Sequence, residues 1–163
     1  MTEVSESGQF VTEEDQVFFD RLTEIFNEKI PFNRLLQLKV DTLSGSDVRM
    51  GFDMREELVG NFMRGNLHGG VISSVLDVIG GLVAFLSMVD NNPGTTLEEK
   101  INLFKRLGTI DLRIDYLRPG MGQSFVVSGY VLRAGKKVTV TRMELHNDKK
   151  VLIAVGTGAY IVG

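Results

Sequence analysis

An almost uniformly apolar segment from Val71 to Val89 constrains the fold of this chain more than any other feature. At about 1.5 Å per residue, a helix of this length approaches the ~30 Å hydrocarbon thickness of a membrane. The segment nevertheless holds one carboxylate, Asp77, and lacks flanking aromatic or basic anchors. We therefore expect no membrane span, but a helix over about 68–89, apolar on all sides, at the centre of a globular domain.

Asp77 is the first candidate for a functional residue, because an unpaired charge is costly to bury in a core helix. His68-Gly69-Gly70 stands directly before the apolar segment, and the N–H groups at a helix N-terminus favour negative charge. Such donors can stabilise the oxyanion of an acyl transfer, while a carboxylate can activate water or attack as a nucleophile. The two elements predict hydrolysis of an activated acyl group such as a thioester.

The spacing of these residues predicts an oligomer. His68 and Asp77 are nine residues apart, which on a helix is about 900° of rotation and ~13 Å of rise. Asp77 therefore cannot serve a substrate bound at the helix start of its own chain. Two such helices packed antiparallel in a dimer bring Asp77 of one chain toward the Gly69 and Gly70 amides of the other. Gly80-Gly81 would then permit close helix packing. We expect a homo-oligomer with shared sites, either a dimer or a dimer of dimers.

The remaining patterns predict an α+β fold. An amphipathic helix is expected over about 13–30, with Thr12 as N-cap and Pro31 as its end. Strands are expected over 38–43, 48–54, 109–117, 124–133, 138–147 and 151–162, with a turn at Gly45-Ser46-Asp47, a loop over 56–67 and a short helix over 97–107. On the strand over 109–117, Ile110 is expected to share one face with the other apolar residues. A curved antiparallel sheet wrapped around one long apolar helix, dimerising through edge strands, satisfies this inventory.

Composition excludes several classes of protein. The 163 residues suit one domain, expected over 13–163, after a flexible tail at 1–12. The net charge of −3 and the scattered basic residues do not fit a nucleic-acid partner. The absence of cysteine rules out disulfides and thiolate sites, and the spacing of His68, His146 and Asp77 predicts no metal site. The polar, acidic start does not fit a signal peptide, so a cytoplasmic location is expected.

These residues resemble the PaaI-like family of hotdog-fold thioesterases, in which His-Gly-Gly is followed by Asp nine residues after the His. His68-Gly69-Gly70 and Asp77 meet that pattern. Further stretches are similar to the YigI-like bacterial branch: 31–34, 108–113, 115–120, 132–135 and 138–147. The resemblance implies a hotdog fold and hydrolysis of medium- to long-chain acyl-CoA. Coenzyme A then belongs to the substrate, and no cofactor is implied.

The resemblance also implies roles for individual residues. Asp77 is the general base or nucleophile, and the amide of Gly69 or Gly70 polarises the thioester carbonyl. His68 positions the carbonyl or the loop, and Thr109 matches a Ser/Thr that assists the water.

Substrate-binding candidates follow from the same resemblance. The family's Asn six residues before the His is replaced by Phe62, which leaves Asn61 and Asn66 as its candidates. The segment Arg133-Ala134-Gly135-Lys136 lies where relatives often contact coenzyme A, which makes Arg133, Gly135 and Lys136 candidates. The segment 91–107 is longer than in many relatives, and we expect it to shape an acyl pocket or to close the site.

Two other functions remain as alternatives. A non-catalytic module that binds or senses acyl-CoA would bind ligand without turnover. A hotdog hydratase or dehydratase is less favoured, because the His-Phe-Pro signature of that branch is absent. Four phenylalanines either line a lipid-sized tunnel or belong to the core: Phe52, Phe62, Phe85 and Phe104.

Overall fold

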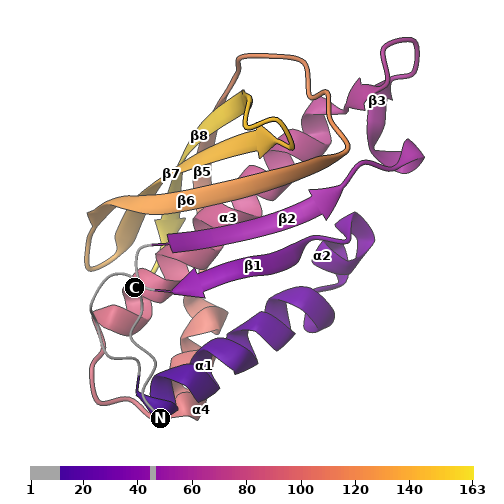
Figure 1. Ribbon diagram of the computed structural model, residues 1–163. Coiled ribbons are helices and arrows are strands. Elements are labelled where there is room, and N and C mark those ends of the chain that lie inside the picture. The colour runs from indigo at the N-terminus through magenta and orange to yellow at the C-terminus, as the bar shows by residue number, and fades with distance from the viewer. Residues whose placement is uncertain (1–11, 45–46) are drawn as a thin grey trace.

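Six antiparallel strands form one curved sheet in the spatial order β1-β2-β6-β7-β8-β5 (Figure 1). The computed structural model describes residues 12–44 and 47–163. The strands are β1 (Lys39–Ser44), β2 (Asp47–Asp53), β5 (Gly108–Tyr116), β6 (Ser124–Ala134), β7 (Val138–Asn147) and β8 (Leu152–Ile161). Their bounds match the predicted strands to within one or two residues, and β1 pairs antiparallel with β2 as expected. Positions 45 and 46 of the predicted turn, and residues 1–11 of the predicted tail, lie outside the described residues.

The long helix α3 (Gly69–Asp90) lies across one face of this sheet and packs against β6, β7 and β8 (Figure 1). Alternate strand residues point toward it, among them Val127 on β6 and Met143 on β7, both fully buried. By length and composition α3 passes the test for a membrane-crossing helix, but most of its apolar window is buried inside the protein. The helix is thus the core of the domain, as its composition predicted.

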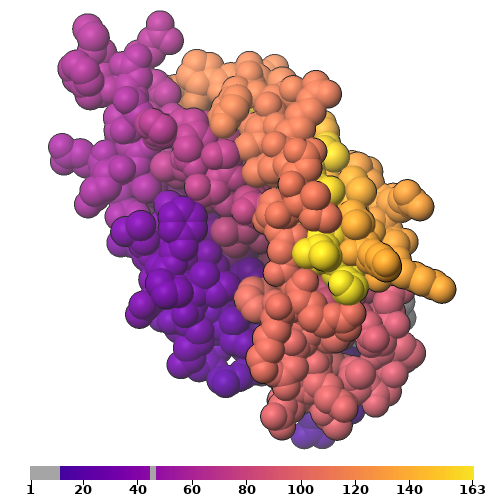
Figure 2. Space-filling model, turned by 180° about the vertical axis from the view of Figure 1, so that it is seen from behind, coloured from indigo at the N-terminus to yellow at the C-terminus, as the bar shows by residue number. Residues whose placement is uncertain are grey.

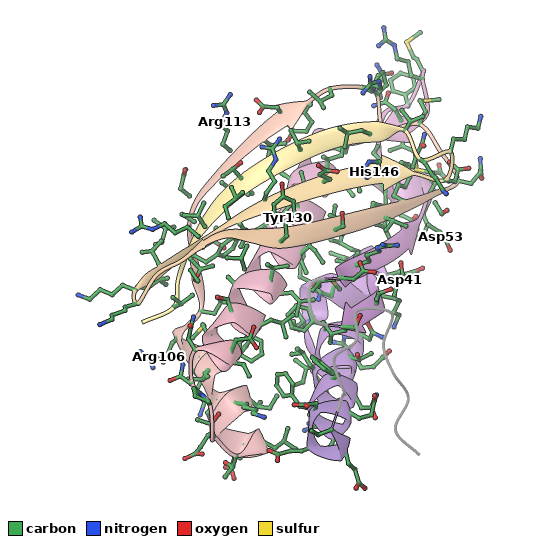
Figure 3. The ribbon with its side chains drawn as sticks, turned by 60° about the vertical axis from the view of Figure 1, so that its left-hand side comes forward. Asp41, Asp53, Arg106, Arg113, Tyr130 and His146 are labelled. Carbon is green, nitrogen blue, oxygen red and sulfur yellow. The ribbon has the colours of Figure 1, made fainter. Side chains whose placement is uncertain are left out.

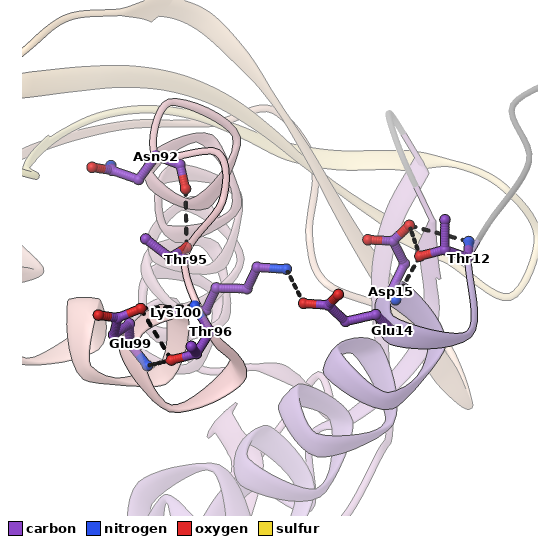
Figure 4. Close-up of polar contacts among 8 residues, drawn as sticks. All are labelled: Thr12, Glu14, Asp15, Asn92, Thr95, Thr96, Glu99 and Lys100. Carbon is purple, nitrogen blue, oxygen red and sulfur yellow. Dashed lines mark hydrogen bonds and ion pairs between the residues drawn. The ribbon is translucent and has the colours of Figure 1, made fainter.

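The N-terminal helical region differs from its prediction at Pro31. Helix α1 (Glu13–Glu24) continues into a π-helical turn, η1 (Ile25–Lys29), and a second helix, α2 (Pro31–Leu36), follows. Pro31 therefore begins a helix as well as ending one, because the first helical position needs no N–H donor. The predicted N-cap is confirmed, since the Thr12 hydroxyl accepts a hydrogen bond from the Asp15 N–H and donates one to the Asp15 carboxylate (Figure 4).

The predicted helix over 97–107 is a short α-helix, α4 (Leu97–Asn102), followed by a 3₁₀ turn, η3 (Leu103–Arg106). Thr96 and Glu99 form a capping box at its start (Figure 4). Lys100 Nζ lies 3.6 Å from Glu14 Oε1, and so ties α4 to α1.

Three of the four candidate tunnel phenylalanines belong to the core. The Phe85 and Phe104 rings lie 5.4 Å apart in an edge-to-face arrangement. Phe52, on β2, is a buried core residue. Phe62 is 89% exposed at the tip of a two-stranded ribbon made of β3 (Val59–Asn61) and β4 (Asn66–Leu67). This ribbon, within the predicted loop and preceded by a 3₁₀ turn, η2 (Glu56–Leu58), protrudes at the upper left of Figure 2.

The alternation predicted for β5 fails at one position. A bulge in the pairing with β8 falls between Thr109 and Asp111, and Ile110 is 56% exposed instead of facing the core with Leu112. Because β5 is an edge strand of the sheet, its outer edge has no neighbouring strand among the described residues. This edge and the exposed Ile110 lie beside the candidate site described next.

Candidate active site

The start of α3 presents a backbone N–H, that of Gly69, without a hydrogen-bond partner in the described part of the chain. His68 is the N-cap, and its Nδ1 accepts a hydrogen bond from the Gly70 N–H at 2.8 Å. The next two amides, of Val71 and Ile72, bond to the His68 carbonyl oxygen. Within residues 12–44 and 47–163, no acceptor pairs with the Gly69 N–H. Of the two amides predicted to bind a carbonyl oxygen, that of Gly69 is therefore the one available.

Neighbouring elements fix the direction of this N–H. The His68 N–H donates to the Leu58 carbonyl oxygen at 2.8 Å, which joins the helix start to η2. The Tyr116 hydroxyl, at the end of β5, donates to the Gly69 carbonyl oxygen at 3.1 Å. Both contacts leave the Gly69 amide free and hold the peptide groups on either side of it.

Asp77, in the middle of α3, is held by two hydroxyl groups from the sheet. Thr109 Oγ1 donates to Asp77 Oδ1 at 3.0 Å. The Tyr160 hydroxyl lies 3.2 Å from the same Oδ1 and 3.1 Å from the Asp77 carbonyl oxygen. Thr109 on β5 and Tyr160 on β8 are direct partners in the sheet register. The half-buried carboxylate thus has the hydrogen-bond donors that a charged group in a core helix requires.

The structure brings Thr109 to Asp77, as the sequence prediction grouped them. Tyr160 was missed, because one hydroxyl within an otherwise apolar strand end looks like a core residue. Gly80 also has a different role from the one predicted. A Cβ on Gly80 would overlap the Tyr160 hydroxyl, so this glycine makes room for Tyr160 inside the chain. It need not be explained by a second helix.

Asp77 and Gly69 of one chain do not form a common site. Gly69 and Asp77 are eight residues apart on α3. In a straight helix this spacing corresponds to ~12 Å of rise and a net rotation of about 80°. A carbonyl carbon cannot be within reach of both groups at once in one chain. The separation that the sequence predicted is thus present in α3.

A pocket of about 390 Å³ opens beside Gly69 and contains both candidate asparagines. Asn61 Oδ1 accepts from the Met63 N–H at 3.1 Å, and Asn66 Nδ2 donates to the Leu67 carbonyl oxygen at 3.0 Å. Both side chains therefore shape the ribbon while lining the pocket. Arg64 and Arg118 line the same pocket and give it positive charge.

A second pocket, of about 380 Å³, lies at the other end of α3 and includes Gly135 and Lys136. Arg106, at the end of η3, lines it as well, although sequence analysis did not single it out. Arg133 is not among its lining residues and is exposed near the end of β6. The pocket therefore groups two of the three predicted coenzyme A contacts and adds a second cation.

A third pocket, of about 900 Å³, does not include Asp77. It lies between α1, the second half of α3 and β6, with Phe18, Val83 and Leu86 in its walls and Lys100 at its side. The segment 91–107 thus borders this cavity and the Arg106 pocket, and its role in shaping an acyl pocket stays a prediction.

The two histidines lie on different parts of the fold. His146 is on the outer face of β7, away from α3 (Figure 3), with its Nε2 3.8 Å from Glu144 Oε2. His68 caps α3. Among the described residues, no group of three or more His, Asp or Glu side chains could hold a metal ion.

Comparison with known proteins defines the class to which this fold and site belong. The family model of the thioesterase superfamily matches residues 64–154, more than half of the chain, so the protein belongs to the thioesterase superfamily. The match contains the start of α3, Asp77 and Thr109.

Individual relatives narrow this class. The chain is 43% identical over 140 residues to the medium/long-chain acyl-CoA thioesterase YigI of Salmonella typhimurium, covering 86% of this chain and 90% of that protein. It is similar to the crystal structure of a protein from Shewanella oneidensis related to the thioesterase superfamily, with a TM-score of 0.86, 46% identity, and coverage of 91% and 97%. A protein of Syntrophus aciditrophicus SB gives a TM-score of 0.84 at 47% identity, covering 93% of this chain and all of that one (100%). The predicted family, hotdog fold and enzyme class are confirmed.

Proposed function

We propose that this protein hydrolyses the thioester of acyl-CoA, releasing a free carboxylic acid and coenzyme A, and that its substrates have medium to long acyl chains. The observation that carries the proposal is Asp77, a carboxylate inside a core helix whose Oδ1 is held by Thr109 and Tyr160. The acyl chain length is supported by the name of the YigI relatives, medium/long-chain acyl-CoA thioesterase. Two of them are 43% and 42% identical to this chain over 140 residues.

The geometry suits a water-activation mechanism. Asp77 accepts a proton from a water molecule, and the water oxygen forms a bond to the thioester carbon. The carbonyl oxygen becomes an oxyanion, which the Gly69 N–H of a second copy of the chain stabilises. The carbon–sulfur bond then breaks, and the thiolate of coenzyme A leaves and takes up a proton.

Direct attack by Asp77 on the thioester carbon is the alternative chemistry. It expels the thiolate of coenzyme A and forms a mixed anhydride, which water then hydrolyses to the acid and the original carboxylate. Single turnover in ¹⁸O-labelled water tests for the anhydride: label in Asp77 would show that water attacked the aspartyl carbon of an anhydride, whereas water activation by Asp77 places the label only in the released acid.

The site is proposed to be shared between two copies of the chain. Because α3 separates Asp77 from Gly69 of the same chain, an antiparallel second α3 is needed to bring the partner's Gly69 toward Asp77. The open edge of β5 is next to Asp77 and carries the exposed side chains of Ile110 and Tyr116. Pairing through this edge would satisfy its backbone groups and cover both side chains. A dimer of dimers fits the same argument.

Binding of coenzyme A is proposed to use the cations around the two smaller pockets. Lys136 and Arg106 lie together in one pocket, with Arg133 exposed near it, and positive groups of this kind bind phosphates. Asn61 and Asn66 are proposed to contact the part of the substrate next to the Gly69 amide. His68 acts by capping the helix, which directs the Gly69 N–H. The reaction uses no cofactor, because coenzyme A enters as part of the substrate, and a cytoplasmic location completes the proposal.

The test is release of free thiol from acyl-CoAs of two to eighteen carbons and from phenylacetyl- and benzoyl-CoA. We expect the wild type to prefer medium or long chains, and Asp77→Asn to lose about 10²- to 10⁴-fold in kcat, the usual contribution of a general base. Asp53→Asn, an exposed carboxylate at the end of β2 and away from the β5 edge, is the matched control and should keep full activity.

Two results would contradict the proposal. Full activity in Asp77→Asn would remove Asp77 from the reaction. Binding of acyl-CoA by the wild type without release of thiol from any member of the panel would instead support the non-catalytic binding module.

A further inference from the structure

We infer that Tyr160 is a positioning residue for the hydrolysis: together with Thr109 it fixes Oδ1 of Asp77 and leaves Oδ2 as the oxygen that meets water or the acyl carbon. The inference rests on the proposed function, since it assigns a task to a neighbour of the proposed base. Tyr160 itself does not reach the substrate.

The hydrogen bonds around Asp77 give the carboxylate one orientation. The Tyr160 hydroxyl oxygen lies within hydrogen-bond distance of both Oδ1 and the Asp77 carbonyl oxygen, at 3.2 and 3.1 Å. Thr109 Oγ1 supplies a second donor to Oδ1 from the neighbouring strand. No hydrogen bond among the described residues reaches Oδ2. Rotation of the carboxylate would break two charge-assisted hydrogen bonds, so Oδ2 keeps its direction.

The chain makes space for Tyr160 at two glycines. A Cβ on Gly80 of α3 would overlap the hydroxyl, and a Cβ on Gly158 of β8 would lie 2.7 Å from Cε2 of the ring. Tyr160 is fully buried, and a buried hydroxyl without a partner is costly. A phenylalanine would fill the same slot without that cost. The polar atom is therefore explained by its contact with Asp77.

The hydroxyl remains a donor at every pH at which the enzyme would work. Burial, followed by the negative charge of Asp77, raises the pKa of Tyr160 well above its usual range. Tyr160 therefore does not compete with Asp77 for the proton of the water.

The test is Tyr160→Phe, which removes one oxygen atom and keeps the ring. We expect kcat to fall by about 10- to 100-fold, the value of a hydrogen bond to a charged group, with KM changed by less than about twofold. The melting temperature should stay close to that of the wild type, because the phenylalanine ring fills the same slot. Tyr130→Phe, on the outer face of β6 (Figure 3), is the matched control and should match the wild type in all three measurements.

The outcomes separate this inference from the proposed function. If Asp77→Asn is inactive while Tyr160→Phe keeps the wild-type kcat, the positioning role is wrong and the hydrolysis stands. A fall in kcat that only matches the loss of folded protein, with a lower melting temperature, would assign Tyr160 to the core alone and also overturn the inference. If Asp77→Asn is fully active, Asp77 is not the base and the inference falls with it; if the wild type releases no thiol from any acyl-CoA, the proposed function itself has failed.

A measurement on the tyrosine ring covers the case in which Tyr160→Phe does not fold. The chain has three tyrosines, so ¹³Cζ-tyrosine labelling gives three NMR signals. Asp77→Ala should shift the Tyr160 signal and leave that of Tyr130 in place. An unchanged Tyr160 signal would overturn the inference.

Discussion

At the start of α3, the proposed oxyanion donor is the Gly69 N–H. It stays free because the capping side chain of His68 accepts its hydrogen bond from the next amide, that of Gly70. In the middle of the same helix, the proposed base is a side chain held by residues that are 32 and 83 positions away in sequence. The first arrangement is set mainly within one turn of chain, and Leu58 and Tyr116 hold the peptide groups on either side of it. The second needs β5, β8 and α3 to be packed in one register.

The difference teaches which part of the site is robust. A backbone donor keeps its direction as long as the helix begins at the same residue. The direction of a side-chain carboxylate depends on each distant partner, so substitutions around Asp77 are expected to change the chemistry without unfolding the protein. Tests of the two regions should therefore give different signatures.

The largest expected effect in this comparison comes from Gly69→Pro. Proline replaces the N–H hydrogen by its Cδ and is compatible with this backbone, since it suits the first helical position and since His68, with φ −64° and ψ 138°, has the conformation that precedes proline. We expect a loss of about 10²- to 10³-fold in kcat, the usual value of one oxyanion donor. Gly69→Ala keeps the N–H, and its Cβ would lie 3.5 Å from the Tyr116 ring, an ordinary contact. Equal activity of the two variants would take the Gly69 amide out of the mechanism.

A smaller effect is expected from Thr109→Val, which removes the other donor to Asp77 Oδ1. Because Tyr160 still holds this oxygen, kcat should fall by only about 3- to 30-fold, with an unchanged circular dichroism spectrum. Thr42→Val on β1 serves as a control for the loss of a strand hydroxyl. Because each donor partly compensates for the loss of the other, the double variant Thr109→Val/Tyr160→Phe should lose more than the product of the two single losses. Purely multiplicative effects would contradict their joint hold on one oxygen.

The smallest effect concerns the far end of α3, where no catalytic group is proposed. Burial raises the pKa of Asp90, the last residue of the helix, and a negative charge is unfavourable at a helix C-terminus. The ionised form therefore weakens folding, and this penalty appears as the pH rises above the unfolded value of 3.8 through the folded pKa. Asp90→Asn should raise the melting temperature by about 1–3 °C at pH 7, with activity unchanged.

This gain should shrink as the pH approaches 4, because Asp90 itself then becomes neutral. Asp53→Asn, an exposed carboxylate at the end of β2 (Figure 3), is the control and should change neither value. A gain that persists at low pH would show that the charge of Asp90 is not its cause.

The same contrast explains how much could be predicted from the sequence. The start of α3 was predictable because His68 and the two glycines after it act within one turn of chain. The long apolar run predicted the central helix, and alternation of apolar and polar residues predicted β1, β2 and most of β5. These signals depend on neighbours in the sequence.

What could not be predicted depends on register between distant elements. Tyr160 has no local feature that points to Asp77, since the contact requires β8 to pack on α3 in the register that places residue 160 beside Asp77. The β5 bulge that turns Ile110 outward arises from pairing with β8. Pro31 was misread because the same residue can end one helix and begin the next. Arg106 joined Lys136 only through the fold of the segment after α4.

The most direct test of the shared site is a heterodimer of Asp77→Asn and Gly69→Pro chains, purified with two different affinity tags. Each homodimer should be nearly inactive. In the heterodimer, one site combines both defects, while the other combines an intact Asp77 with an intact Gly69. The account predicts about half of the wild-type activity per dimer, because one of two sites is restored. A heterodimer as inactive as its parents would show that Asp77 and Gly69 do not act together across two chains, and would contradict the account.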